Sequence, residues 1–457
     1  MNKNNFSEWA SQSHLARILF LALLILALHI PIKSIEGLVS ERRATEAQAV
    51  AEVQQKWGQD QRIVGPMLVI PYQVKRSWQH GHGAANEPKI EIKKAVFLPD
   101  AYEAISQLNN ETRYRGIFEV PIYQATVNLQ GHFSKPRFDT WNINEEDVLW
   151  DKARMLVMVS DARAIQKQAV VSWDGREYFF EPGTDDATAN YEGYHVDLTN
   201  FSGAGDKYNF SIKLFLNGSN SIYFAPLGKD SLIKVTAPWP DPSFQGKWLP
   251  TTRQVNSDGF SSQWQIPYLG RSYPQQTQDY SAIHEHINQS LVGVDLISPI
   301  DNYRMAERSI KYVLLFLSLT FVAIWLIEVI AKLRVHIMQY LFIGAGLCMF
   351  YLLELSLSEH LGFYWAYAIA TVAIVAMVSF YSSVVLRTGK RAAIVGSSLA
   401  GLYLYLFTLL QEQNYALLIG SIGLFLILAT IMYITRNIDW YKLTQIPVVS
   451  NDSVENA

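Results

Sequence analysis

The sequence predicts an α-helical membrane bundle of six transmembrane helices and a large, mainly-β extracytoplasmic domain. Six apolar stretches are each close to the length that a helix needs to cross a hydrocarbon core of ~30 Å. One long segment between the first and second stretches holds most of the charges and turn residues. The charged fraction of the chain is 17%, below the ~25% of soluble domains. Part of the chain is therefore expected to avoid water.

The first apolar stretch, residues 15–32, is predicted to be a signal-anchor transmembrane helix. It could be the core of a cleaved signal peptide, but the bulky residues after it do not form a signal-peptidase site. The mature protein is therefore expected to keep Met1 to Lys33. Five more apolar stretches follow the long polar segment, at residues 312–331, 337–358, 362–386, 392–410 and 415–435.

The short loops between the stretches predict the orientation. Basic residues occupy alternate loops, whereas the intervening loops carry Glu359 and His360, and then Glu412, with no lysine or arginine. Loops rich in lysine and arginine stay in the cytoplasm. Both termini are thus expected on the cytoplasmic side and the large domain outside. In a bacterium this arrangement means an inner-membrane protein with a periplasmic domain. The predicted parts are a cytoplasmic N-terminus (1–14), the anchor (15–32), a periplasmic domain with helical stalks (33–311), five transmembrane helices (312–435) and a cytoplasmic tail (436–457).

The periplasmic domain is predicted to be mainly β, as one large unit or two smaller ones. An amphipathic helix is expected from about 35 to 57, with Gly58 as its C-terminal cap, and a second helix is expected to start at about 298. Strands are predicted at 62–74, 90–98, 115–129, 155–159, 208–216 and 221–224. Asp174-Gly175 and Asn217-Gly218 are candidate hairpin turns.

The sequence carries no recognisable catalytic or cofactor motif. It has no phosphate-binding loop, dinucleotide fingerprint or nucleophile elbow. Ser231 and Lys234 match a catalytic spacing, but residues three apart in a strand point to opposite faces. The net charge of −3 argues against a nucleic-acid partner, because phosphate binding needs a basic surface. We therefore expect no enzymatic activity and no cofactor.

Two histidine pairs are candidate metal ligands. They are His80 with His82 and His284 with His286. A spacing of two residues shares a face only in extended chain, and neither pair has an evident third ligand. The pairs are interpreted as solvated loop histidines, so no metal site is predicted.

Ionisable residues inside the apolar stretches are costly to insert and each requires a role. Glu328 can be neutralised by Lys332 at i,i+4. Arg436 and Asp439 can pair with each other, or reach Glu328 at the same membrane depth, or Arg436 can be an orientation charge alone. Glu354 could belong to a proton or cation relay, or to a polar helix end that reaches water.

Several strings resemble the CreD family of bacterial inner-membrane proteins. They are VGPMLVIP at 64–71, VSDAR at 159–163, WPDPSFQG at 239–246, LP at 249–250, MQY at 338–340, FYLL at 350–353, LSEH at 357–360 and TRNIDWY at 435–441. Glu328, Glu359, His360, Arg436 and Asp439 match the family pattern and are the candidate structural or functional polar residues. Asp241 and Glu354 depart from it, since the family commonly has His and Leu there.

The resemblance implies an envelope-integrity protein linked to the CreBC two-component system, with altered tolerance to colicins and β-lactams. It implies no known enzymatic activity, so no catalytic residue is carried across. We expect the periplasmic domain to sense, bind or scaffold an envelope protein, a lipid or a cell-wall component, with the lipid bilayer around the helices. A transporter or exporter component is the main alternative, and an envelope hydrolase is the third.

Overall fold

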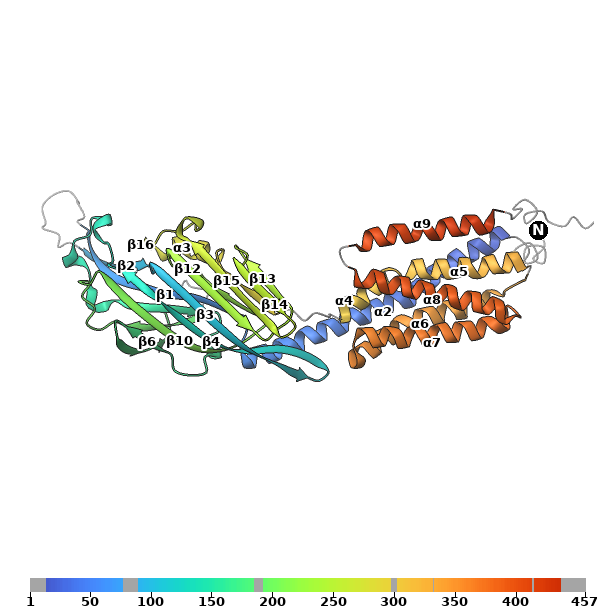
Figure 1. Cartoon of the computed structure of the whole chain (residues 1–457), viewed down its shortest axis with the longest axis horizontal. Coiled ribbons are helices and arrows are strands. Elements are labelled where there is room, and N and C mark those ends of the chain that lie inside the picture. The colour runs from blue at the N-terminus through green and yellow to red at the C-terminus, as the bar shows by residue number, and fades with distance from the viewer. Residues whose placement is uncertain are drawn as a thin grey trace, which may run out of the picture. The chain divides into compact units, whose positions relative to one another are not determined.

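The computed structural model describes residues 14–76, 89–184, 192–296, 302–331, 333–412 and 415–436. The chain forms two compact units, which we describe separately (Figure 1). The bundle unit comprises Met1–Glu46 and Ile300–Ala457, and the β unit comprises Ala47–Pro299. Several predictions fall outside the described residues: those on His80 and His82, on the helix start at 298, on Lys332 and on Asp439.

The β unit is built from two sheets. Sheet A has the strand order β13-β17-β11-β1-β5-β9-β8, with β2 paired to β1 and β16 paired to β2. Its strands are β1 (Gln61–Arg76), β2 (Lys89–Phe97), β5 (Arg154–Val159), β8 (Glu181–Pro182), β9 (Glu192–Asp197), β11 (Ser221–Phe224), β13 (Pro242–Gly246), β16 (Gln276–Thr277) and β17 (Val292–Leu296). The mainly-β prediction is confirmed.

Sheet B has the order β14-β15-β12-β3-β4-β10-β6-β7. Its strands are β3 (Ala101–Arg115), β4 (Phe118–Ser134), β6 (Val170–Trp173), β7 (Arg176–Phe179), β10 (Lys207–Ser219), β12 (Asp230–Ala237), β14 (Thr252–Asn256) and β15 (Gly259–Pro267). The alternation of buried and exposed residues along β10 and β12 is typical of strands with one face on a core. Ser231 is buried and Lys234 is exposed, as their spacing predicted.

One apolar core joins the two sheets. Its buried members come from both sheets and include the fully buried side chains of Trp264, Tyr72, Tyr102, Tyr123 and Phe133. Burying each such side chain stabilises the fold by about 2 kcal/mol. A single core of this kind shows that the β unit is one unit rather than two.

The two candidate hairpin turns have different outcomes. Asp174 and Gly175 connect β6 to β7 with φ values of 48° and 79°, the backbone that a two-residue hairpin needs. Asn217 and Gly218 instead lie inside β10, opposite Gln124 and Tyr123 of β4, so the second hairpin prediction is wrong. The chain turns at Asn220 (φ 54°) and then enters β11 of the other sheet.

The first and last strands of the β unit that flank the membrane segments lie close together in sheet A. β1 pairs with β11 in parallel, with Gln61 opposite Ile222. β17 pairs with the other edge of β11 in the antiparallel sense, with Val294 opposite Ile222. The start of β1 and the end of β17 are therefore at the same end of the sheet, separated by one strand.

The predicted anchor and the predicted amphipathic helix are one continuous helix. Helix α2 (His14–Trp57) has 44 residues and contains Pro31, so it is about 66 Å long at 1.5 Å per residue. Its end is where the sequence predicts it: the amide of Gly58 donates to the carbonyl of Gln54 at 2.9 Å. A Cβ at Gly58 would lie 2.8 Å from the carbonyl oxygen of Asn217, so only glycine fits there.

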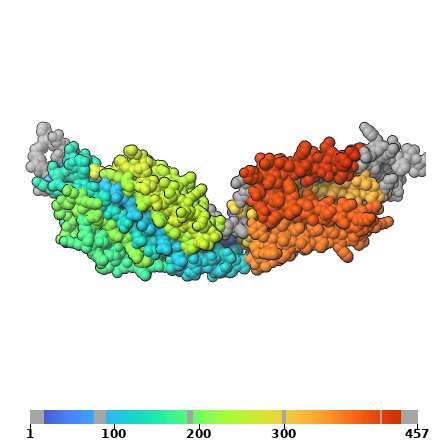
Figure 2. Space-filling model, in the orientation of Figure 1, coloured from blue at the N-terminus to red at the C-terminus, as the bar shows by residue number. Residues whose placement is uncertain are grey.

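The bundle unit holds the remaining membrane helices. They are α5 (Val313–Ala331), α6 (Ile337–Leu361), α7 (Phe363–Val385), α8 (Gly389–Gln411) and α9 (Ala416–Thr435), preceded by the shorter α4 (Asn302–Lys311). Together with α2, six described helices are long and apolar enough to span a membrane, which confirms the predicted spans. Helix α9 has no buried residue, and Figure 2 shows it in red on the surface of the bundle.

Candidate functional site

The outer face of sheet A carries a second apolar surface, opposite the main core. Val64, Met67, Val69, Val96 and Met158 point to this side. Helix α3 (Tyr280–Asn288) covers part of it through Ile283 and Ile287. Beside α3 the surface is open and forms a groove with a volume of about 840 Å³. We call it the sheet A groove.

The groove has an apolar floor and a charged rim. The floor comes from neighbouring strands and contains Met67, Val69, Ile92, Val96, Leu156 and Met158, and the basic rim residues are Lys93, Lys94, Lys152 and Arg154. Asp151, Asp197 and Asp279 also line it. Arg154 and Asp197 form an ion pair at 2.6 Å. An apolar cleft with a few polar groups is the usual form of a small-molecule site.

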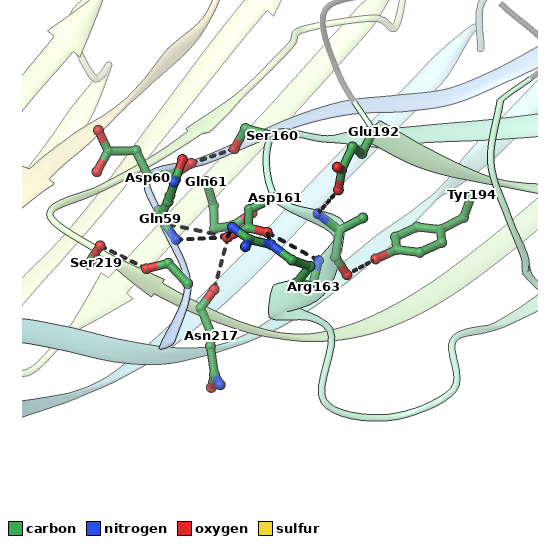
Figure 3. Close-up of polar contacts among 12 residues, drawn as sticks. Gln59, Asp60, Gln61, Ser160, Asp161, Arg163, Glu192, Tyr194, Asn217 and Ser219 are labelled. Carbon is green, nitrogen blue, oxygen red and sulfur yellow. Dashed lines mark hydrogen bonds and ion pairs between the residues drawn. The ribbon is translucent and has the colours of Figure 1, made fainter. Parts of the chain in front are cut away.

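A polar network fixes the segment that follows α2 (Figure 3). Its centre is Asp161, which is 3% exposed although it is a carboxylate. Asp161 accepts hydrogen bonds from the Gln59 amide at 3.2 Å and from Nε of Arg163 at 3.0 Å. The hydrogen bond to Asp161 raises the pKa of Arg163. A buried carboxylate needs such donors to stay ionised.

Three neighbouring contacts complete this network. The Ser219 hydroxyl donates to the Gly58 carbonyl at 2.9 Å, and Nε2 of Gln61 donates to the Asn217 carbonyl at 3.0 Å. The Tyr194 hydroxyl donates to the Ala162 carbonyl at 2.5 Å, and burial raises the pKa of Tyr194 to about 12. The VSDAR string therefore anchors the end of α2 to sheet A. The role that the structure shows for this string is structural, and its Ser160 hydroxyl donates to the Asp60 carbonyl.

Glu359 lies where three helices of the bundle unit meet. The Arg42 guanidinium of α2 binds its two oxygens, at 2.6 Å from Nε and 2.9 Å from Nη2. The Tyr303 hydroxyl of α4 donates to Oε1 at 2.8 Å. Burial, followed by the hydrogen bond to Glu359, raises the pKa of Tyr303. Glu359 therefore contacts both α2 and α4. His360, the next residue, is exposed.

Glu328 has partners in the described residues that the sequence did not suggest. Arg17 of α2 forms an ion pair with it, and the Tyr340 hydroxyl donates to Oε2 at 2.9 Å. The Val335 amide donates to Oε1 at 3.2 Å. The predicted contact of Arg436 with Glu328 is therefore wrong. Arg436 follows the exposed helix α9 and lies over the ring of Tyr433, 4.2 Å from its centroid. The alternative of an orientation charge stays a prediction.

Glu354 is the most deeply buried carboxylate of α6, with 1% exposure. The Ser309 hydroxyl of α4 donates to its Oε2 at 2.9 Å. The prediction that Glu354 could belong to a polar helix end in contact with water is wrong, because packing of α4 closes this position. The relay interpretation stays a prediction.

The second histidine pair lies in a helix rather than in a loop. His284 and His286 belong to α3, where residues two apart point about 200° away from each other. His284 contacts Tyr280 and Asn288 at 3.1 Å through its two ring nitrogens. No group of three or more potential metal-ligating side chains occurs in the described parts of the chain.

Sequence reasoning missed Arg17 and Arg42 as partners and the whole groove. Arg17 lies at the start of the first apolar stretch and Arg42 follows it. In the sequence both look like charges that only set the orientation of the helix in the membrane. A signal for the groove was available: the VGPMLVIP run of β1 is apolar at successive positions, which is typical of a strand covered on both faces. One of those faces is the groove floor.

Comparisons with known proteins identify the family of the chain. The family model described as "Inner membrane protein CreD" matches residues 13–441. Inner membrane protein CreD of Escherichia coli K12 is 30% identical over 423 residues, which cover 92% of each chain. The matched region contains the Asp161 network and the bundle-unit carboxylates Glu328, Glu354 and Glu359.

Solved structures give only weak similarity. An M1 zinc metallopeptidase mutant from Deinococcus radiodurans has a TM-score of 0.20 and 11% identity, over 37% of this chain and 39% of that one. Leukotriene A4 hydrolase from Saccharomyces cerevisiae has a TM-score of 0.18 and 12% identity, over 36% and 28%. The chain thus spans well under half of these proteins, and scores this low transfer neither a fold nor an activity.

The family match covers nearly the whole chain, and the six apolar helices agree with a protein that crosses the bilayer repeatedly. The chain belongs to the CreD family and is a multi-pass inner-membrane protein.

Proposed function

We propose that this protein maintains cell-envelope integrity in the response linked to the CreBC system, and that its β unit binds an envelope component. The sheet A groove carries this proposal. It is a preformed cleft of about 840 Å³ on the β unit, and concave apolar sites of 300–1,000 Å³ are typical of ligand binding. Exposed apolar patches of this kind mark interaction sites.

The lining indicates the chemistry of the ligand. The strand side chains of the floor can cover a hydrocarbon chain, which gains free energy by leaving water. Four basic and three acidic side chains surround the floor, so the rim has a small positive excess. An amphiphile with an apolar chain and an anionic head, such as an envelope lipid, fits this pattern best.

The proposal also places the β unit in the periplasm and gives the protein a non-enzymatic function. The basic residues Arg334, Arg387, Lys390 and Arg391 lie at one set of helix ends, which favours the cytoplasm for those ends and the periplasm for the β unit. Binding of this kind needs neither a cofactor nor a nucleophile. We therefore propose a non-enzymatic protein whose β unit senses or scaffolds its ligand.

In-cell photocrosslinking tests the groove. A benzophenone amino acid replaces Ile92 on the groove floor, where the native side chain is 57% exposed. Phe179 of β7 in sheet B is also 57% exposed and provides the matched control site. After irradiation, the purified protein is analysed for covalent adducts by mass spectrometry. We expect an adduct with the mass of an anionic envelope lipid at position 92 and none at position 179.

A variant with a blocked groove provides a second test of the proposed ligand site. Leu156→Lys places a charge on the floor, and we expect it to reduce the adduct at position 92 severalfold. Equal adducts at both positions, or an adduct that Leu156→Lys does not change, would contradict the proposal. Capture of a transporter subunit at position 92 in place of a lipid would favour the alternative of a transporter component.

A further inference from the structure

The buried carboxyl of Glu354 has fewer partners than an ionised group needs. Its Oε2 accepts one hydrogen bond, from Ser309 at 2.9 Å. Its Oε1 is buried and has no hydrogen-bond partner in the described residues. The Tyr351 hydroxyl, one turn away on α6, is also buried without a partner. An ionised carboxylate has about four acceptor sites, so most of them would be unfilled.

The groups around Glu354 cannot neutralise a negative charge. Three tyrosine hydroxyls interact with it electrostatically, from Tyr351 of α6, Tyr367 of α7 and Tyr403 of α8. Cys348 of α6 lies beside Tyr351 and Tyr403. These groups are neutral at pH 7. The surroundings therefore accept an uncharged carboxylic acid far more readily than a carboxylate.

The nearest arginine in the sequence of α4 is engaged elsewhere. Arg308 precedes Ser309, but its guanidinium donates to the carbonyls of Leu410 at 2.8 Å and Leu409 at 3.0 Å at the end of α8. Among the described residues no lysine, arginine or histidine forms an ion pair with Glu354.

Two other carboxylates of the bundle unit provide an internal comparison. Glu328 is paired with Arg17, and Glu359 is paired with Arg42. Both have the cationic partner that keeps a buried carboxylate ionised. Glu354 is more buried than Glu359 and lacks such a partner, so its chemistry differs from theirs.

We propose that Glu354 is a proton-binding site at the contact between α4 and α6, occupied at pH 7. The proton makes the carboxyl neutral and supplies a donor at an oxygen that otherwise has no partner. Loss of the proton places an unpaired negative charge beside Ser309 and three tyrosines, which weakens the packing of α4 on α6. The inference uses only the bundle unit and does not depend on the ligand of the sheet A groove.

Infrared spectroscopy of the full-length protein in lipid tests the protonation state directly. The spectrum of Glu354→Gln is subtracted from that of the wild type at pH 7. We expect the difference to contain the C=O stretching band of one protonated carboxylic acid. Glu359→Gln is the matched control and is expected to remove carboxylate bands instead. Carboxylate bands in the Glu354→Gln difference would overturn the proposal.

Thermal unfolding provides an independent readout. We expect Glu354→Gln to unfold at or above the wild-type temperature at pH 7, because the amide resembles the neutral acid of the folded state, whereas the unfolded wild type gains stability by ionising. As the pH rises from 5 to 7, the wild type should lose stability relative to this variant, since its unfolded chain releases the proton at position 354 while the folded protein retains it. A Glu354→Gln variant as destabilised at pH 7 as Glu359→Gln would overturn the proposal as well.

Discussion

Arg42 and Glu359, 317 positions apart in the sequence, form a two-pronged ion pair between helices α2 and α6. The side chain of Glu359 is 12% exposed and that of Arg42 is 34% exposed. Paired N–H donors that match both carboxylate oxygens are among the strongest charged hydrogen bonds. This pair therefore holds α2 against the helix that also contacts α4.

The first prediction concerns this pair. Arg42→Ala should destabilise the bundle by about 2 kcal/mol, because Glu359 would stay partly buried with its charge unpaired. Arg43 is the matched control: it pairs with Glu307 at 3.1 Å, with the two side chains 48% and 33% exposed. Arg43→Ala should cost less than about 1 kcal/mol. Unfolding of the purified protein by titration with a denaturing detergent measures both, and equal losses would contradict the expected difference.

The second prediction tests whether Arg17, the partner of Glu328 in the structure, or Arg436, the candidate from the sequence, stabilises this carboxylate. Arg17→Ala should lower stability, and the loss should shrink in a Glu328→Gln background, because the charge that Arg17 neutralises is then absent. Arg436→Ala should behave additively with Glu328→Gln. A double-mutant cycle on thermal unfolding temperatures measures both couplings. Coupling of Arg436 to Glu328 of the same size as that of Arg17 would show that Arg17 is not the specific partner of this carboxylate.

Both pairs show what the sequence can and cannot establish about the site. Hydropathy placed the six spans correctly because runs of about 20 consecutive apolar residues are rare outside membrane helices. The same reasoning could not choose the partner of Glu328, since Arg17, Lys332 and Arg436 all follow or precede a span at similar depth. Between Arg17 and Arg436 the packing of α2 and the exposure of α9 decide, whereas Lys332 lies outside the described residues.

The sheet A groove illustrates a second limit. Its floor combines strands β1, β2 and β5, and the strand order of a sheet is not contained in the alternation pattern of any one strand. Local signals performed better where the chain itself supplies both partners, as at Asp174-Gly175 and Gly58. The Asn217-Gly218 prediction was wrong because long-range pairing of β10 with β4 overrode the turn preference of those residues.

The third prediction concerns the network around Asp161. Asp161→Asn keeps the shape of the side chain but removes its charge, which weakens the hydrogen bonds from Gln59 and Arg163. The cost should be about 1–3 kcal/mol, as for a buried hydrogen bond to a charged group. Hydrogen exchange should accelerate at the amides of residues 58–61, and Asp174→Asn, at the turn between β6 and β7, is the remote control. Unchanged exchange at these amides would show that Asp161 does not anchor the segment.

The fourth prediction concerns pH. Burial, together with the charge of Lys207, lowers the pKa of His132 below its ordinary value of 6.5, despite the opposing effect of Asp100. The unfolded chain therefore binds the proton more readily than the folded one, and stability falls as the pH drops below about 6.5. His132→Gln should lose less stability than the wild type between pH 7.5 and pH 5.5. Tryptophan fluorescence of the full-length protein follows unfolding, and parallel losses in both proteins would exclude a contribution from His132.

The fifth prediction tests the proposed orientation. An enzyme reporter that is active only in the periplasm should be active when fused after Gln275 and inactive when fused after Lys390, because basic loops stay inside. A reporter active only in the cytoplasm should give the opposite pattern. Periplasmic activity at Lys390 would reverse the proposed orientation of the β unit and of both termini.

The adjacency of β1 and β17 in sheet A has a consequence for how this protein can be engineered. With strands spaced ~4.8 Å apart, two strands separated by one neighbour lie roughly 10 Å apart, a gap that three or four residues of extended chain can close. The β unit can thus be cut out as a cassette and replaced by a short glycine-rich bridge, leaving the membrane helices in one chain. Orthologous or designed cassettes could be exchanged at the same two junctions to make chimaeras.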